Sequence, residues 1–281
     1  MKKILVPTDF SKNALKAVLY AAEIAKRYNA TIYLLHILEA ITGRIHQPYD
    51  LHEKLEEEIV SNRENELATL QKSIAISYPD VKIQKEVIKG TVTNSIAEFA
   101  GNNEIDLIVM GTKGATGLRE LLMGSVATAT IDSTKIPVLA IPDEYDMEEP
   151  DGILFATNSF EENKLLLNTI VDLAKLFSAV IYVTVFIDTD SAEAVDYINY
   201  TQKLSQYVEF LQKAYPGVSF KSELIDGTEF EKTIEKYHDK NGADIMAMIT
   251  YRKGFWERFF KKSITKKMAS HSKIPLLAIP G

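Results

Sequence analysis

The sequence predicts an α/β protein of two tandem doubly wound domains, each a five-stranded parallel sheet with helices on both faces. Two observations lead to this prediction: the chain contains an internal repeat, and short apolar runs alternate with helical patterns within it. The apolar runs are too continuous for a sheet with one solvated face. We therefore expect the strands to be covered on both sides.

Four segments of the first half recur in the same order in the second half. They are residues 2–14 with 152–164, 30–39 with 179–188, 77–91 with 214–228, and 135–142 with 273–280. Ordered matches of this kind indicate a repeated unit, and the first copy carries extra residues within 40–76. We predict homologous domains at 1–143 and 151–281. The acidic segment between them contains Pro150 and is expected to form a short solvated linker.

Each element of the first copy follows from a local pattern. Ser11 is expected to cap a helix whose apolar side carries Ala14, Ala17, Val18, Ala21 and Ala25. Strands are expected at 3–7, 31–37, 81–88, 106–111 and 137–142. Further helices are expected at 51–74, 93–100 and 125–133, the first with an apolar side of Leu55, Ile59, Leu67, Leu70 and Ile74.

Bulk composition excludes several classes of protein. The chain has 281 residues, is 46% hydrophobic and 25% charged, and contains no apolar run long enough to span a membrane. The apolar run near the N-terminus is too short for a signal peptide. The absence of cysteine excludes disulfides and thiolate sites and fits a cytoplasmic location. A net charge of −7 argues against nucleic acid as the main partner.

A glycine-rich loop joins the predicted strand ending at Gly111 to the predicted helix opening at Gly124 and Ser125. A helix N-terminus offers free amides to an anion, and glycine allows close approach of a phosphate. Lys113 adds positive charge, and Asp9 at the end of the first strand is suited to accept hydrogen bonds from ribose hydroxyls. The spacing matches neither of the common phosphate-binding fingerprints, so a turn of small residues remains the alternative.

The motif Gly111-x-x-Gly114, nine further residues and Gly124-Ser125 resembles that of the ATP-binding branch of the universal stress protein family. The opening "ILVPTDFS" and the closing "IPVLAIP" are similar to the family's first and last strands. The resemblance covers essentially the whole chain as two tandem domains. It implies the strand order 3-2-1-4-5, in which Asp9 and Gly111 lie side by side.

The resemblance also implies a role for each site residue. Asp9 would hold the ribose, Pro7, Thr8 and the backbone of Ile37 would line the adenine pocket, and Met110 and Gly111 would flank base and sugar. The phosphates of ATP, with or without Mg²⁺, would be surrounded by Lys113, Gly114, Gly124, Ser125, Val126 and Ala127. Ala127 stands where relatives can carry a hydroxyl residue. Because alanine cannot donate a hydrogen bond from its side chain, the expected binding of the phosphates is weaker unless Thr128 contributes.

The second copy has lost most of this motif. Gly111, Gly114 and Gly124 correspond to Ile249, Arg252 and Lys262, and only Ser263 keeps its match. Asp9 corresponds to Asn158, which lacks the anionic acceptor. We therefore expect the second domain not to bind ATP in the manner of the family.

The resemblance also suggests how the domains associate. Family members pair through their last strands, so we expect an intrachain pseudo-dimer through Pro137–Pro142 and Pro275–Pro280. The sequence does not decide whether two chains also associate as a homodimer.

Other features allow less specific interpretations. Residues 252–267 mix aromatic and basic side chains, a composition suited to binding single-stranded nucleic acid or an anionic membrane. The favoured interpretation is that the aromatic side chains fill the crevice of the second repeat, where a nucleotide is not expected, or pack on the other repeat. A surface on which a partner protein docks is the next interpretation of residues 252–267. No histidine pair has metal-ligand spacing, and His36 is expected to be a satisfied, half-buried side chain.

The sequence is compatible with three functions: a nucleotide-binding stress or regulatory module, a slow ATPase, and a structural interaction protein. The intact motif in one copy argues against the third. The first is favoured over the second because no general base is visible near the loop.

Overall fold

The computed structural model describes residues 1–39, 49–112, 125–145, 149–228, 230–251 and 274–281. The first repeat contains β1 (Lys3–Pro7), α1 (Lys12–Tyr28), β2 (Thr31–Leu38), α2 (Tyr49–Ser77), β3 (Lys82–Lys89), α3 (Val92–Asn102), β4 (Leu107–Gly111), α4 (Ser125–Ser133) and β5 (Val138–Ile141). The second contains β6 (Gly152–Ala156), α5 (Lys164–Phe177), β7 (Val180–Asp188), α6 (Ala194–Ala214), β8 (Phe220–Gly227), α7 (Phe230–Asn241), β9 (Ile245–Thr250) and β10 (Leu276–Pro280). Every element predicted for the first copy is present.

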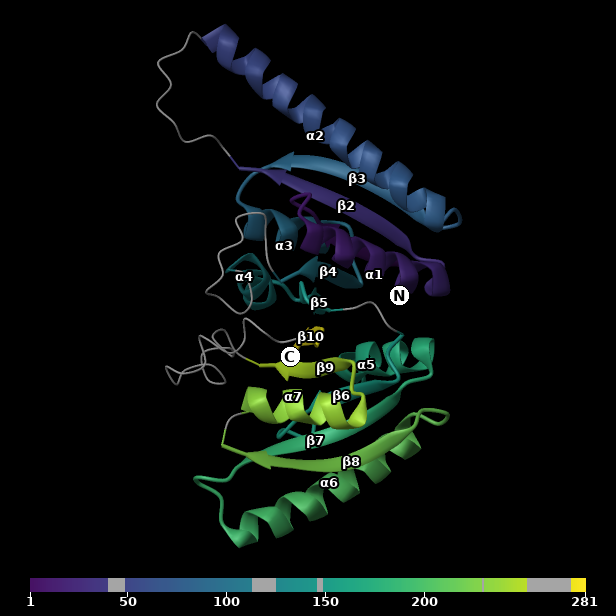
Figure 1. Cartoon of the computed structure of the whole chain (residues 1–281), viewed down its shortest axis with the longest axis vertical. Helices are drawn as coiled ribbons and strands as arrows, with labels where there is room; N and C mark the ends of the chain where they lie inside the picture. Colours follow the sequence, from purple (N-terminus) through teal and green to yellow (C-terminus); the bar gives the residue numbers. More distant parts are fainter. Residues whose placement is uncertain (40–48, 113–124, 146–148, 229, 252–273) are drawn as a thin grey trace.

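All these strands lie in one ten-stranded sheet, in the order β3-β2-β1-β4-β5-β10-β9-β6-β7-β8. Each half has the predicted order 3-2-1-4-5, and all neighbours within a half are parallel. The halves are joined by antiparallel pairing of β5 with β10 (Figure 1). The two predicted sheets are therefore continuous with each other.

The register between β5 and β10 is symmetric. Leu139 and Leu277, which hold the same place in the two repeats, pair with each other. Their neighbours Val138 and Ala278 form the next pair along the strands. The two repeats are therefore related by an approximate twofold axis at this central pair.

Helix α1 begins where the sequence predicts. The Ser11 hydroxyl accepts a hydrogen bond from the backbone N–H of Ala14 at 3.1 Å, which satisfies one of the amides at the helix N-terminus. The predicted apolar side is buried against β1 and β4, with Ala17 and Ala21 fully enclosed. The helix ends at Asn29, which adopts the left-handed conformation.

Helix α2 departs from its predicted apolar side. Leu67 and Ile74 are buried, whereas Leu55 is 41% exposed. In Figure 1 the N-terminal half of α2, which includes Leu55, diverges from β2 and β3. The periodic pattern therefore identifies the helix but not how far along it the packing extends.

The segment between the repeats is packed rather than solvated. Tyr145 is only 6% exposed, and its ring lies 5.9 Å from that of Tyr20 in α1. Pro150 is buried as well, and the ammonium of Lys16 donates hydrogen bonds to the backbone oxygens of Asp143 and of Tyr145. The prediction of a solvated linker is wrong for these residues because α1 provides an aromatic and polar surface that they cover.

The C-terminal end of α1 also holds the second repeat. The Tyr28 hydroxyl donates to the backbone oxygen of Asp172 at 2.6 Å. Arg27 donates to the backbone oxygen of Leu176 at 3.3 Å, and its guanidinium lies 5.1 Å from the centre of the Phe177 ring. These contacts join α1 to α5 across the middle of the molecule.

Replacing Tyr145 with alanine tests whether the connecting segment contributes to stability. Loss of a buried aromatic side chain is expected to lower the free energy of unfolding by about 3 kcal/mol. The measurement is urea denaturation followed by circular dichroism. Ile76→Ala, which truncates a side chain that is 84% exposed on α2, is the matched control and should change little. Equal effects of the two variants would contradict a packed linker.

Candidate functional site

The carboxyl ends of β1 and β4 lie side by side at one edge of the sheet, where the connections that follow the two strands diverge; this edge is called the crevice of the first repeat. The two strands are parallel neighbours, with Ile4 paired to Leu107. The helices that follow them cover opposite faces of the sheet, since α1 packs in the core cluster that contains Val6 and α4 packs in the cluster that contains Leu5. In doubly wound sheets such a divergence of connections is where ligands bind. The predicted site residues in β1 and β4 lie at this edge.

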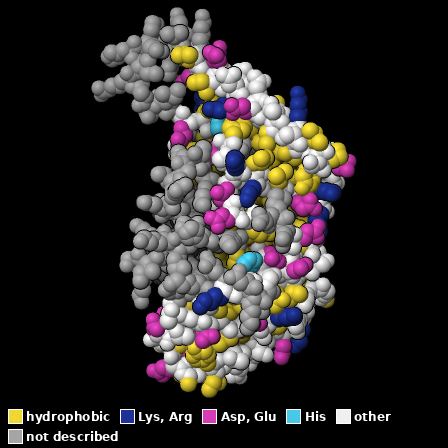
Figure 2. All heavy atoms as spheres, viewed as in Figure 1, with side chains coloured by type: hydrophobic (Ala, Val, Ile, Leu, Met, Phe, Trp, Pro, Cys, Tyr) yellow, Lys and Arg dark blue, Asp and Glu magenta, His cyan; other side chains and the backbone are white. Residues whose placement is uncertain are grey.

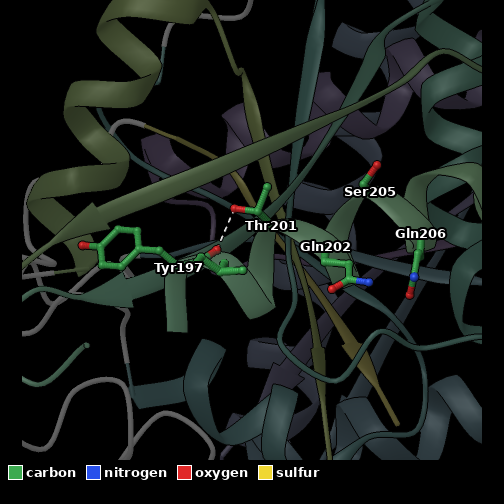
Figure 3. Close-up of a pocket in the computed structure, with 6 residues that line it drawn as sticks. Tyr197, Thr201, Gln202, Ser205 and Gln206 are labelled. Atoms are coloured by element: carbon green, nitrogen blue, oxygen red, sulfur yellow. Dashed lines mark hydrogen bonds between the residues drawn. The ribbon is translucent and has the colours of Figure 1, made fainter. Parts of the chain in front are cut away.

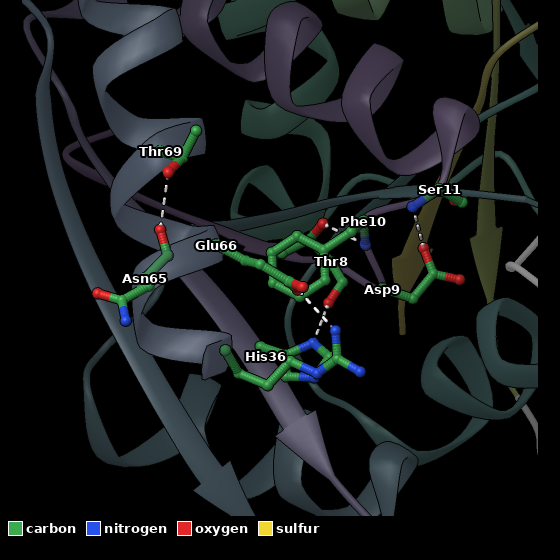
Figure 4. A network of polar contacts seen from close by, with 9 residues as sticks. Thr8, Asp9, Phe10, Ser11, His36, Asn65, Glu66 and Thr69 are labelled. Carbon is green, nitrogen blue, oxygen red and sulfur yellow. Dashed lines mark hydrogen bonds and ion pairs between the residues drawn. The ribbon is translucent and has the colours of Figure 1, made fainter. Parts of the chain in front are cut away.

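The turn after β1 is fixed through Thr8 (Figure 4). Its backbone N–H donates to the Leu35 oxygen at 2.9 Å, and its hydroxyl accepts from the Phe10 N–H at 3.1 Å. The backbone oxygen of Thr8 lies 2.8 Å from His36 Nδ1, which carries a proton because a carbonyl oxygen only accepts. His36 is therefore the satisfied, half-buried histidine that the sequence favoured.

Asp9 is exposed at the rim of the crevice. One carboxylate oxygen accepts a hydrogen bond from the Ser11 N–H at 3.0 Å, as Figure 4 shows. The following residue, Phe10, has a positive φ of 63°, which few non-glycine residues adopt. This sharp turn keeps the carboxylate at the edge of the sheet while α1 begins directly behind it.

Gly111 is half-buried at the end of β4, and the other predicted site residues divide into three groups. Pro7, Ile37, Met110 and Ala127 are buried, and the last three share one core cluster. Ser125 and Val126 are exposed in the first turn of α4. Lys113, Gly114 and Gly124 lie outside the described residues, as does the basic and aromatic stretch 252–267.

A groove that the sequence did not predict adjoins Asp9. It encloses about 560 Å³ and is lined by Asp9, Phe10, Arg63, Asn65, Glu66, Thr69, Leu70 and Ser73. Arg63 pairs with Glu66 at 2.6 Å, and its guanidinium lies 5.8 Å from the centre of the Phe10 ring. The groove lies on the α2 side of the β1–α1 turn. No sequence motif marks these residues of α2.

A second groove of about 530 Å³ follows the outer face of α6 (Figure 3). Its six lining residues, from Tyr197 to Gln206, all come from this one helix. The polar groups are therefore not brought together from several elements, as a specific small-molecule site requires.

On the face shown in Figure 2, acidic and basic side chains of the described residues are interspersed.

The corresponding crevice of the second repeat has a different lining. β9 pairs with β6 as β4 pairs with β1, so Ile249 takes the place of Gly111. Tyr251, directly after β9, donates its hydroxyl hydrogen bond to the carboxylate of Glu161 in the β6–α5 connection. Tyr207 of α6 donates to the backbone oxygen of Glu161. Side chains of this chain thus link the two connections.

The Tyr251–Glu161 bond is reflected in the acidity of both groups. The hydrogen bond from Tyr251 lowers the pKa of the Glu161 carboxyl. Burial, together with the hydrogen bond to Glu161, raises the pKa of Tyr251 to about 12. At neutral pH the tyrosine is therefore protonated and the glutamate ionised, which is the pairing that maintains the link.

Two kinds of feature are absent from the described part of the chain. Among the described residues, no group of three or more histidine, aspartate or glutamate side chains is arranged to hold a metal ion. Within the same part of the chain, no helix is both long and apolar enough to cross a membrane.

Comparison with known proteins identifies the class. The fold and the crevice are those of a doubly wound α/β protein of two repeats. A model of the universal stress protein family matches residues 1–142 and again residues 151–280. The chain therefore belongs to the universal stress protein family, and this membership supports a role in the response to stress.

Individual relatives agree with this assignment. The universal stress protein MJ0531 of Methanocaldococcus jannaschii is 36% identical over 140 residues, covering 50% of this chain and 81% of that protein. Universal stress protein A homolog 1 of Coxiella burnetii is 32% identical over 144 residues, covering 50% and 95%. A solved universal stress protein from Archaeoglobus fulgidus matches 99% of this chain and 96% of its own, with a TM-score of 0.70 and 19% identity, which supports the two-repeat fold.

Tyr251→Phe tests the link across the second crevice. Removing the hydroxyl removes the hydrogen bond that favours the ionised carboxylate, so the pKa of Glu161 is expected to rise toward its usual value. Carboxyl chemical shifts followed by NMR against pH give that pKa directly. Because the pKa of Glu161 is lowered in the folded state, its contribution to stability is present above the unfolded pKa and is lost as the pH falls through the folded pKa. An unchanged pKa in the variant would show that the bond is absent in solution.

Proposed function

We propose that the protein is a stress-response regulatory module that binds ATP, or the related ADP or AMP, in the first repeat (1–143). The second repeat (151–281) is degenerate and serves pairing or partner contacts. One observation carries the proposal: the carboxylate of Asp9, oriented by the Ser11 N–H, lies at the end of β1 next to the strand that ends in Gly111. A carboxylate at a divergent strand edge is suited to bind the vicinal hydroxyls of a ribose.

The other residues have complementary roles in this proposal. Pro7, Thr8 and the backbone of Ile37 contact the base, and Met110 and Gly111 flank base and sugar. Lys113, Gly114, Gly124, Ser125, Val126 and Ala127 surround the phosphates and any Mg²⁺ that accompanies them. The exposed Ser125 and Val126 in the first turn of α4 support this assignment, since backbone amides there favour an anion.

The second crevice supports the asymmetry. Ile249 fills the position of Gly111, and the Tyr251–Glu161 hydrogen bond joins the loops between which a nucleotide would enter. A ligand would have to break this bond and displace the side chains. We therefore assign nucleotide binding to the first repeat alone.

The symmetric pairing of β5 with β10 supports an intrachain pseudo-dimer. Leu139 and Leu277 pair at the centre, as equivalent residues do in an isologous dimer. In this proposal the strands at 137–142 and 275–280 form within one chain the contact that two separate chains form in a homodimer.

Calorimetric titration with ATP, ADP and AMP tests the proposal, and one site per chain is expected. Asp9→Asn should weaken binding by about 10- to 100-fold, because it removes a charged hydrogen-bond acceptor. Asparagine keeps the side-chain oxygen that accepts from the Ser11 N–H, so the turn is expected to persist.

The matched control is Asn158→Ala in the second repeat, which should leave the affinity unchanged. Gly124→Lys, which copies Lys262 of the second repeat, should abolish binding. Two sites per chain, or an unaltered affinity in Asp9→Asn, would contradict the assignment. Phosphate release at high protein concentration distinguishes simple binding from slow hydrolysis.

A further inference from the structure

Asn13 is a polar residue buried in the first turn of α1, with 3% of its surface exposed. Its side-chain amide donates a hydrogen bond to the backbone oxygen of Ile141 at 3.1 Å. Ile141 ends β5, which is separated from β1 by β4. A single side chain thus ties the helix that follows β1 to a strand two positions away in the sheet.

Gly111 provides the space for this tie. A Cβ atom on Gly111 would lie 2.4 Å from Asn13 Oδ1 and 2.8 Å from Asn13 Cγ, closer than nonbonded atoms approach. Gly111 is paired with Ile141 in the sheet, so the Asn13 side chain lies over the ends of β4 and β5 together. The Gly111 backbone does not need a positive φ, and the requirement for glycine at this position is one of space.

The second repeat uses another arrangement at the same place. The carbonyl of Ile279, which corresponds to Ile141, accepts a hydrogen bond from the Thr250 hydroxyl at 3.3 Å. At the offset that relates Asp9 to Asn158, Asn13 corresponds to Glu162, which is exposed. The neighbouring Asn163 caps α5, accepting from the Leu165 N–H at 3.0 Å. In this repeat the bulky Ile249 is buried near the end of β9. Glycine and the asparagine tie therefore occur together in one repeat and are both replaced in the other.

We propose that Asn13 is a positioning residue of the nucleotide site. By anchoring the start of α1, it sets the distance between the Asp9 turn and the end of β4. This inference rests on the proposed function. The path is short: the Ile141 oxygen holds Asn13, the same helical turn is capped by Ser11, and the Ser11 N–H orients Asp9. The glycine that opens the loop motif is needed because Asn13 occupies the space where its side chain would be.

A double-mutant cycle of Asn13→Ala and Gly111→Ala tests this role by ATP titration and thermal melting. Asn13→Ala should weaken ATP binding about tenfold, because the Asp9 turn loses its anchor. Gly111→Ala should weaken binding in the wild-type background, since the new Cβ displaces Asn13. In the Asn13→Ala background the same change should have a smaller effect, because the two closest contacts are removed and only the backbone carbonyl carbon of Asn13, 3.1 Å from the new Cβ, remains.

The comparison remains decisive if Gly111→Ala alone does not fold, since Asn13→Ala and the double variant are compared directly. A large loss of affinity on adding Gly111→Ala to Asn13→Ala would overturn the proposal, because glycine would then serve the nucleotide itself. Tyr145→Ala is the control for stability: it should lower the melting temperature without changing the affinity.

The proposed function and the positioning role fail in different ways. If the wild-type protein binds no ATP, the proposed function falls and the positioning role falls with it. If the wild type binds and Asn13→Ala binds equally well, only the positioning role is overturned.

Discussion

The antiparallel pairing of β5 with β10 is the interaction on which the architecture depends. Both strands are almost entirely apolar and buried, and each would otherwise be the exposed edge of a five-stranded sheet. Such an edge offers unpaired backbone groups to other chains. Pairing the two edges places the most apolar strands at the centre and leaves the charged β3, with Lys82, Lys85 and Glu86, at one end of the sheet.

The two repeats share a framework and differ where a ligand would enter. Both have a threonine after the first strand whose hydroxyl accepts from the N–H of a phenylalanine with positive φ. Beyond that shared turn, the first repeat has Asp9 and Gly111 at an open edge, and the second has Ile249 and the Tyr251–Glu161 bond. The fold therefore tolerates both linings.

Local sequence patterns were sufficient for the elements of the first repeat, and the family resemblance supplied the strand order within each repeat. They could not show that Tyr145 is buried, because its acidic surroundings resemble those of a solvated linker and its partner Tyr20 is far away in sequence. The packing of only part of α2 was equally hidden, since periodicity repeats along the whole helix. For the site, the motif indicated Asp9 and Gly111, but Asn13 looked like one polar residue beside an alanine-rich face. Its role depends on a contact with Ile141, 128 positions along the chain.

The covalent connection between the repeats has a consequence for how the two halves could diverge. In an assembly of identical chains, every substitution appears twice, so a change that closes one crevice closes both. Here each half has its own codons, and the packed segment around Tyr145 keeps them together at a fixed one-to-one ratio at any protein concentration. One half can thus lose a ligand while the other keeps it, and no exchange of subunits can produce molecules with two intact or two altered halves.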